Sequence, residues 1–174
     1  NPLTLIRKVD SLNTTNSNQR YAFDFDIIKV CGNWLSYQIL SGGQISIANF
    51  GSSLSNQPAI SLSNVGSPSN HRFAQVVQSD GKVYLIIQRQ NGPIHVYNFG
   101  SDGLNLNPTF SVFSSVFSGG NTKGFEVYKD KSTFYLAGLN YSSQQLYTNK
   151  FNNFNDQLNS IDSSNTISQL PYSS

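Results

Sequence analysis

Acidic side chains are the first place to look for chemistry in this chain, because its other reactive groups are few. It has one Glu, Glu126, together with eight Asp and two His. Cleavage of a glycosidic bond needs two carboxyl groups that face one cleft. Asp24 and Asp26 flank Phe25, so they share one face of an extended strand. Only Glu126 offers an acid at a corresponding place further along the chain, which favours solvated or strand-edge carboxylates over a catalytic pair.

Other catalytic patterns are absent from the sequence. It contains no G-x-S-x-G motif, so nothing marks a nucleophilic serine. His71 and His95 have no Cys or carboxylate at the spacing of zinc ligands. Asp102 lies in a Gly-Ser-Asp-Gly segment like part of a calcium loop, but the further acidic ligands are missing and a turn is favoured. We therefore expect no enzyme activity, no metal and no cofactor.

Composition excludes several classes of protein. The net charge of +2 is too small to indicate a nucleic-acid or anionic-membrane partner. No apolar run approaches the roughly 18 residues that span a bilayer. Nine Tyr, 12 Phe and one Trp argue against a disordered chain. Cys31 is the one cysteine, which excludes a disulfide within the chain, and its place at the end of an apolar strand predicts a buried, inert thiol.

The elements that must position these side chains repeat about every fifty residues. Ile27, Val76 and Val127 recur at intervals of 49 and 51 residues. The set Trp34, Val83 and Phe134 recurs at the same two intervals. A period of this length with several short strands in each unit is typical of a β-propeller blade.

Each repeat is predicted to form four antiparallel strands. In the middle repeat, Asp80-Gly81 separates two apolar runs and predicts a tight hairpin turn. The repeats cover approximately residues 21–66, 70–118 and 122–170. The predicted strands are 25–30, 34–40, 45–50 and 58–62; then 73–78, 83–89, 94–99 and 108–113; then 125–128, 134–139 and 146–151. The fourth strand of the last repeat is marked only by Leu158 and Ile161.

Residues 1–12 are expected to hold a further outer strand. Residues 2–6 match the pattern of residues 58–62 and 108–112, each of which opens with a proline. The predicted fold is therefore all-β and propeller-like, with three consecutive four-stranded antiparallel blades plus an N-terminal outer strand from a preceding or closing blade. Propellers typically have about 4–8 blades. We accordingly expect this single domain to be part of a larger propeller.

The middle repeat resembles a known family of repeats. Residues 79–84 read Ser-Asp-Gly-Lys-Val-Tyr and are followed by Ser101-Asp102-Gly103 and Phe110. This pattern, strongest over residues 73–113, resembles the tandem β-propeller repeats of bacterial proteins with a strand–DGK–strand motif. The outer repeats lack the triplet and have Cys31-Gly32-Asn33 and Asp130-Lys131-Ser132 instead. The resemblance implies an extracellular adhesive or structural role and nothing catalytic.

Topology predicts where binding residues would gather. In a blade, the loop that enters the first strand and the loop between the second and third strands lie at the same end. One end should therefore carry a ring of cations, amides and hydroxyls suited to a glycan or protein partner, unless these are ordinary solvated turns. The candidate binding residues are Arg20, Asn70, His71, Arg72, Arg89, Asn91, Lys123 and Tyr141. The other end should collect Asp80, Asp102, Asp130, Asp156, Lys82, Lys129 and Lys131.

Two functions follow from these patterns. The favoured one is a non-enzymatic structural or adhesive module, extracellular or exposed on a cell surface, filament or virion. Its partners would be a protein, further blades of the same assembly or a surface glycan, without nucleic acid or membrane insertion. The alternative is a carbohydrate-active propeller, either a lectin or a glycoside hydrolase. For the core, we expect burial of Ile27, Trp34, Val76, Val83, Leu85, Val127, Phe134 and Leu136.

Overall fold

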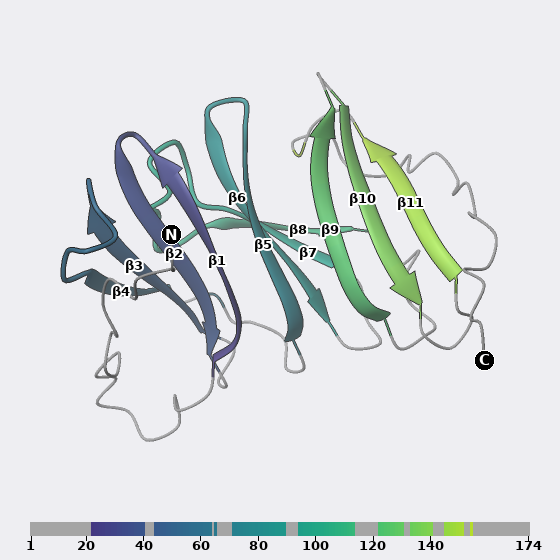
Figure 1. The fold of residues 1–174 in the computed structure, drawn as a ribbon, viewed down its shortest axis with the longest axis horizontal. Helices are drawn as coiled ribbons and strands as arrows, with labels where there is room; N and C mark the ends of the chain where they lie inside the picture. The colour runs from purple at the N-terminus through teal and green to yellow at the C-terminus, as the bar shows by residue number, and fades with distance from the viewer. Residues whose placement is uncertain are drawn as a thin grey trace, which may run out of the picture.

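The chain folds into a row of antiparallel β-sheets (Figure 1). The structure is a computed structural model and describes residues 22–40, 44–63, 65, 71–89, 94–113, 122–130, 133–140, 145–151 and 154. Eleven strands and no helix are found among these residues. The predicted all-β class is therefore confirmed.

The three sheets correspond to the three predicted blades, and each is a simple meander. Blade 1 has the order β1-β2-β3-β4, blade 2 has β5-β6-β7-β8, and blade 3 has β9-β10-β11. The bounds are β1 Ala22–Val30, β2 Asn33–Leu40, β3 Ile45–Gly51, β4 Ala59–Ser63, β5 His71–Ser79, β6 Lys82–Arg89, β7 Ile94–Asn98, β8 Thr109–Phe113, β9 Thr122–Asp130, β10 Thr133–Asn140 and β11 Gln145–Phe151. The predicted N-terminal strand and the fourth strand of blade 3 lie outside the described residues.

Two equivalent hairpins show why the strands turn where they do. Asp80 and Gly81 have φ angles of 50° and 68°, and Cys31 and Gly32 have φ angles of 49° and 83°. Both pairs thus have the two consecutive positive φ values that a type I′ turn requires. The expectation of a buried Cys31 is wrong, because this residue is the first turn residue at the tip of a hairpin and is exposed.

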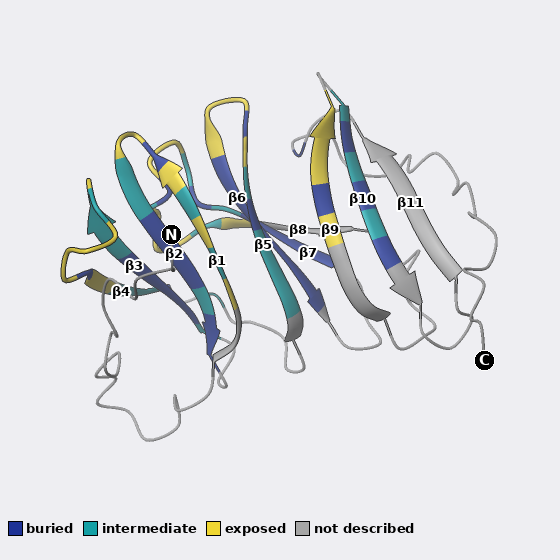
Figure 2. Cartoon of the chain, in the orientation of Figure 1, coloured by how far each residue is buried: buried dark blue, intermediate teal, exposed yellow. Residues whose placement is uncertain are grey.

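The hydrophobic core lies between the blades. Strands β1, β5 and β9 lie nearest one another and form the inner edge of the row. Between blades 1 and 2, one cluster joins residues of β2 and β3 to residues of blade 2; its members include Leu35, Tyr37, Ile39, Ile45, Ile47, Val83, Leu85, Ile87, Tyr97 and Phe99. Between blades 2 and 3, a second cluster contains Tyr84, Ile86, Ile94, Val96, Val127, Phe134, Leu136 and Phe154. Strand β6 is buried on both faces because it contributes to both clusters (Figure 2).

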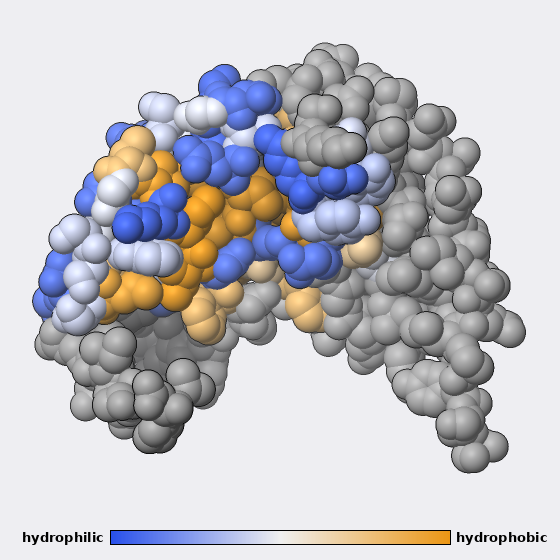
Figure 3. Space-filling view, turned by 45° about the horizontal axis from the view of Figure 1, so that its top comes forward, coloured by the Kyte–Doolittle hydropathy of each residue, from blue (hydrophilic) through white to orange (hydrophobic). Residues whose placement is uncertain are grey.

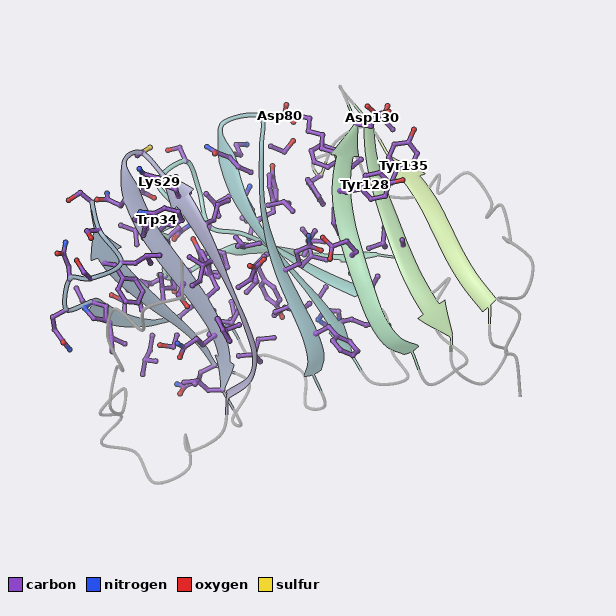
Figure 4. All side chains as sticks on the ribbon, in the orientation of Figure 1. Lys29, Trp34, Asp80, Tyr128, Asp130 and Tyr135 are labelled. Atoms are coloured by element: carbon purple, nitrogen blue, oxygen red, sulfur yellow. The ribbon has the colours of Figure 1, made fainter. Side chains whose placement is uncertain are left out.

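Six of the eight predicted core residues are buried, and two are not. Ile27 is 39% exposed and Trp34 is half-buried, so the prediction is wrong for these two. Leu35 and Tyr37 face blade 2, and strand alternation places Trp34 and Ile27 on the opposite face of blade 1. There the Lys29 Nζ lies 5.5 Å from the centre of the Trp34 ring (Figure 4).

The loop between β7 and β8 of blade 2 makes two hydrogen bonds to blade 1 and so stabilises the interface between these two blades. The Tyr37 hydroxyl donates to the Gly103 carbonyl at 2.6 Å, and the Ser63 hydroxyl donates to the Leu106 carbonyl at 3.0 Å. Gly103 has a φ of +76°, and a Cβ there would lie 2.5 Å from the Tyr37 oxygen, so only glycine fits. Burial, with a smaller contribution from Asp102, raises the pKa of Tyr37 far above its ordinary value. The phenol therefore remains a hydrogen-bond donor.

Candidate functional site

The inner strands carry one polar residue at the same place in each blade. Asp26, Gln75 and Glu126 immediately precede the repeating positions Ile27, Val76 and Val127 on β1, β5 and β9. We call these three the inner-edge residues. Because the three strands are neighbours, the inner edge is the place where side chains from all three blades come closest.

Asp26 uses both of its carboxylate oxygens on backbone groups. Its Oδ2 accepts a hydrogen bond from the Val76 N–H of blade 2 at 2.8 Å. Its Oδ1 accepts one from the N–H of the next residue, Ile27, at 2.7 Å. The carboxylate thus joins the inner strands of blades 1 and 2, and its first role is structural.

Gln75 makes the corresponding contact from blade 2 to blade 3. Its Oε1 accepts from the Val127 N–H at 2.5 Å, and its Nε2 donates to the Val127 carbonyl at 2.7 Å. The same Nε2 donates to the Glu126 Oε1 at 2.9 Å. Each of the first two blades therefore holds the inner strand of the following blade through a side chain at one repeated position.

Glu126 differs from the other two because it is exposed. The Gln75 amide binds its Oε1, and no hydrogen bond among the described residues joins it to Asp26. A carboxylate fixed at one oxygen and open to solvent can accept from a sugar hydroxyl or exchange a proton with a substrate. The described side chains thus provide one accessible acid at the inner edge rather than a facing pair.

The predicted ring of binding residues is only partly visible. Arg20, Asn70, Asn91 and Tyr141 lie outside the described residues, and the other four are described by their backbone alone. On blade 2, His71 pairs with Arg89 across β5 and β6, so the strand ends that carry His71, Arg72 and Arg89 do meet. Lys123 lies near the start of β9, where Thr122 pairs with Asn140. A binding role for these side chains stays a prediction.

The charged residues expected at the other end are better described. Asp80, Asp102 and Asp130 are exposed, as are Lys82 and Lys129, while Asp156 and Lys131 lie outside the described residues. Figure 4 places Asp80 and Asp130 at the same end of the row. The described residues include no group of three or more His, Cys, Asp or Glu side chains that could hold a metal ion. No helix in this part of the chain is long and apolar enough to cross a membrane.

Gln75 is the site residue that the sequence analysis did not identify. Gln75 is neutral whereas Asp26 and Glu126 are acidic, and of these three residues only the two acids were candidates for catalysis in the sequence. The repeat alignment does contain the signal, because all three residues stand directly before its most regular position. What they share is a side-chain oxygen, and those of Asp26 and Gln75 each accept a backbone N–H of the following blade.

Comparison with known proteins gives structural but no sequence relatives. No protein-family model matches the chain, and no curated protein matches its sequence. A solved structure from Bifidobacterium bifidum s17, assigned as an exo-β-1,3-galactanase, superposes with a TM-score of 0.51 and 13% identity over 74% of this chain and 46% of that one. A second, a β-1,3-galactosidase of the GH43 class, has a TM-score of 0.58 and 11% identity over 82% of this chain and 31% of that one. The chain thus spans less than half the length of either.

These neighbours confirm the fold and correct one expectation. Both are β-propeller glycoside hydrolases, so the propeller-like arrangement of blades is confirmed, while the strand–DGK–strand family remains a resemblance. The expectation that the chain is not an enzyme is wrong. It rested on the lack of catalytic motifs, and two solved structures that share this fold carry the names of glycan-cleaving enzymes. At this level of identity the similarity itself shows the fold: the chain has the β-propeller fold that these glycoside hydrolases share.

Proposed function

We propose that the chain is part of a carbohydrate-active β-propeller that hydrolyses glycosidic bonds, with β-1,3-linked galactose polymers as the first substrates to test. The observation that supports this most directly is the exposed Glu126 at the inner edge of a fold shared with two glycan-active enzymes. The inner edge is also where the three blades approach one another, so a sugar bound there can contact several blades at once.

Glu126 is the residue assigned to acid catalysis. The Gln75 Nε2 donates a hydrogen bond to the Glu126 Oε1 at 2.9 Å, which restricts the Glu126 side chain and leaves its other carboxyl oxygen to carry the proton. The acid would protonate the leaving glycosidic oxygen while a second carboxylate activates water or attacks the sugar. Asp24 is assigned that second role because it lies on the same inner strand as Asp26 but not at the position that joins the blades.

The first test is Glu126→Gln. The substitution keeps the side-chain shape and the acceptor for Gln75 but removes the acidic proton. We expect the release of reducing sugar from β-1,3-galactan to fall by about 100-fold or more, with binding of the polymer retained. Asp24→Asn should give a loss of similar size.

Asp130→Asn is the matched control, because Asp130 is an exposed acid on the same strand, β9, at its far end. It should leave activity unchanged. If the wild-type chain cleaves the polymer and Glu126→Gln cleaves it equally well, the assignment of Glu126 is wrong. If the wild-type chain binds but does not cleave any of a panel of glycans, the function is that of a lectin. A wild-type chain that does neither contradicts the proposed function.

The extracellular or surface location predicted from the sequence accords with this function, because polymeric glycans do not cross membranes. We retain it as part of the proposal. Fractionation of the source cells, with detection by an antibody to the chain, tests it, and recovery in the soluble interior fraction would contradict it.

A further inference from the structure

The side of blade 3 that points away from blade 2 carries a distinct set of side chains. The residues of β9 and β10 that point into the cluster shared with blade 2 are Val127, Phe134 and Leu136. Strand alternation and the pairing of β9 with β10 place the residues between them on the opposite side. We call this opposite side the outer face of blade 3, and its described residues include Glu126, Tyr128, Asp130, Tyr135 and Ala137.

Tyr128 is exposed at a position that is covered in the other two blades. The repeat aligns it with Ile28 and Val77, which pack against the cluster between blades 1 and 2 and the cluster between blades 2 and 3. Tyr128 is larger than either, carries a hydroxyl group and is 48% exposed. The outer face therefore presents an aromatic ring to solvent where the covered faces have an aliphatic side chain.

Asp130 gives the outer face a charge at a position that is buried in the other blades. The repeat aligns it with Val30 and Ser79, both buried, whereas Asp130 is exposed. A protein surface packed on this face in the same way would bury the Asp130 carboxylate, which is costly unless the charge is paired. On the side shown in Figure 3, the described hydrophobic residues form a continuous band mainly at the left, and hydrophilic residues predominate toward blade 3. The outer face thus suits a ligand that leaves part of it in contact with water.

Two tyrosine rings on the outer face hold each other in a fixed orientation. Tyr128 and Tyr135 are partners across the β9–β10 pair, and their rings stack with centroids 5.0 Å apart and planes at 11° (Figure 4). Because Tyr135 covers one face of the Tyr128 ring, the exposed part of Tyr128 includes its other face. We call this pair the tyrosine platform. Since the two rings are already packed together, they lose little conformational freedom when a ligand binds.

A sugar ring has the chemistry that such a platform binds. A pyranose has faces of C–H groups and a rim of hydroxyl groups. The C–H groups carry a small positive charge and pack against the negative face of an aromatic ring. The hydroxyl groups need hydrogen-bond partners, which water supplies at an open surface. A wholly apolar ligand would gain less here than in an enclosed pocket, because much of its surface would stay in water.

We propose that a pyranose unit of a glycan stacks on the tyrosine platform, next to the unit that is cleaved at Glu126. The proposal rests on the proposed function for the class of ligand and for the role of Glu126. Tyr128 lies two residues from Glu126 on the same face of β9, so their Cα atoms are about 7 Å apart, comparable with the length of one sugar unit. Ala137 pairs with Glu126 across the strands, and its small side chain leaves room for the glycan beside the acid.

The first test is calorimetric binding of the β-1,3-linked galactose trisaccharide to a chain that carries Glu126→Gln, which prevents cleavage during the measurement. In that background, Tyr128→Ala and Tyr128→Leu remove the ring and should each raise the Kd by about 10-fold or more. Tyr128→Phe keeps the ring and should stay within about 3-fold of the parent. Leu54→Ala is the control, because Leu54 is 42% exposed but lies between β3 and β4 of blade 1, and its Kd should not change. Equal binding by Tyr128→Leu and Tyr128→Phe overturns the proposal.

Proton NMR of the trisaccharide tests the stacking itself. Protons that lie over the face of an aromatic ring shift upfield, so the C–H protons on one face of one sugar unit should move upfield on binding. The shift should persist with Tyr128→Phe and disappear with Tyr128→Leu, and binding without any such shift overturns the proposal. With Glu126 intact, Tyr128→Leu should raise the KM for β-1,3-galactan more than it lowers kcat, because the platform binds a unit that is not itself cleaved. Circular dichroism of each variant checks that it is folded.

The outcomes separate the platform from the hydrolytic function. If the wild-type chain binds the trisaccharide without cleaving it and Tyr128→Leu loses that binding, the platform stands and hydrolysis is wrong. If Glu126→Gln abolishes cleavage while Tyr128→Leu binds and cleaves like the wild type, hydrolysis stands and the platform is wrong. A wild-type chain that binds no glycan overturns both. A wild-type dimer that Tyr128→Ala converts to a monomer, as measured by light scattering, would show that protein covers the rings and would also overturn the platform.

Discussion

The interface between blades 1 and 2 and the interface between blades 2 and 3 are built on one plan but packed differently. In both, a side chain on the inner strand, Asp26 or Gln75, accepts a hydrogen bond from a backbone N–H of the following blade; the donor is the residue directly after the equivalent position. In both, β6 contributes alternate buried residues. The inner contact is thus the constant part of the repeat.

Away from the inner edge the two interfaces diverge. The first is mainly aliphatic, with Tyr37 meeting Phe99 edge to face at 5.0 Å and bonded to the Gly103 carbonyl of the loop between β7 and β8. The second also contains aliphatic residues, but three of its aromatic rings contact one another: Phe154 stacks on Tyr84 at 4.8 Å and meets Phe134 edge to face at 4.9 Å. The comparison teaches that the inner-strand contact sets how blades align, while the outer packing varies as long as it fills the space.

The largest expected effect on the free energy of unfolding comes from removing one of the contacting aromatic rings between blades 2 and 3. Phe134 is buried and contacts Phe154, so Phe134→Ala would leave a cavity between blades 2 and 3 and lower the free energy of unfolding by about 3–5 kcal/mol. Hydrogen exchange should show the loss of protection concentrated at Val127 and Leu136. Amides of β3, such as Ile45 and Ile47, should be affected less because they belong to the other cluster.

Urea unfolding measures the total loss, and Leu35→Ala provides the matched change in the first interface. A loss below about 1 kcal/mol for Phe134→Ala would mean that the register between blades 2 and 3 is wrong. Equal loss of protection in both clusters would mean that the three blades unfold as one unit and that the two interfaces are not energetically separate.

Local sequence patterns predicted the strands and turns within each blade, but they could not show which faces of a blade are covered by another blade. Asp80-Gly81 and the apolar runs around it determine the hairpin through backbone conformation, which is a property of a few adjacent residues. Ile27 fits the same repeat column as Val76, yet it is exposed, because burial depends on a preceding blade rather than on the residue itself. Cys31 was assigned to a strand end, although it occupies the turn position that Asp80 has in blade 2.

The candidate site was harder to predict than the fold for a related reason. Asp26 and Val76 are 50 residues apart, and the contact between them depends on how two blades are placed. Gln75 carries no charge and belongs to no motif, so its contacts with Val127 and Glu126 became visible only in three dimensions. The absence of local catalytic motifs was likewise uninformative, since side chains that meet in the fold can be far apart in the sequence, as Gln75 and Glu126 are.

An intermediate effect on the free energy of unfolding is expected from removing the hydrogen bond between Tyr37 and Gly103, which distinguishes the first interface. Tyr37→Phe removes the hydroxyl and leaves the Gly103 carbonyl without its donor, which should cost about 1–2 kcal/mol near neutral pH. Burial raises the pKa of Tyr37 above its ordinary value of 10.0, so the folded state favours the protonated phenol. Its contribution is therefore complete below about pH 10 and decreases above it, where the unfolded chain gains by ionising this group.

Urea unfolding of the wild type and of Tyr37→Phe at neutral pH and above about pH 10 checks the sign of this dependence. Other tyrosines and the lysines titrate in the same range in both proteins, so the quantity of interest is the difference between them. This difference should shrink at high pH. A difference that grows with pH would mean that Tyr37 is ionised in the folded state.

The smallest expected effect would improve the second interface. Gln88 is buried, and neither of its amide atoms has a hydrogen-bond partner among the described residues. The repeat places it at the position of Ile39, which packs in the aliphatic cluster of the first interface. Gln88→Leu keeps nearly the same volume and removes two polar groups that are desolvated without compensation, so it should raise the free energy of unfolding by about 1 kcal/mol.

Gln78→Leu, on the exposed part of β5, is the control and should change stability by less than about 0.5 kcal/mol. Urea unfolding measures both variants. A lower free energy of unfolding in Gln88→Leu would show that the Gln88 amide stabilises the fold. The second interface would then depend on a buried polar residue that the first does not require.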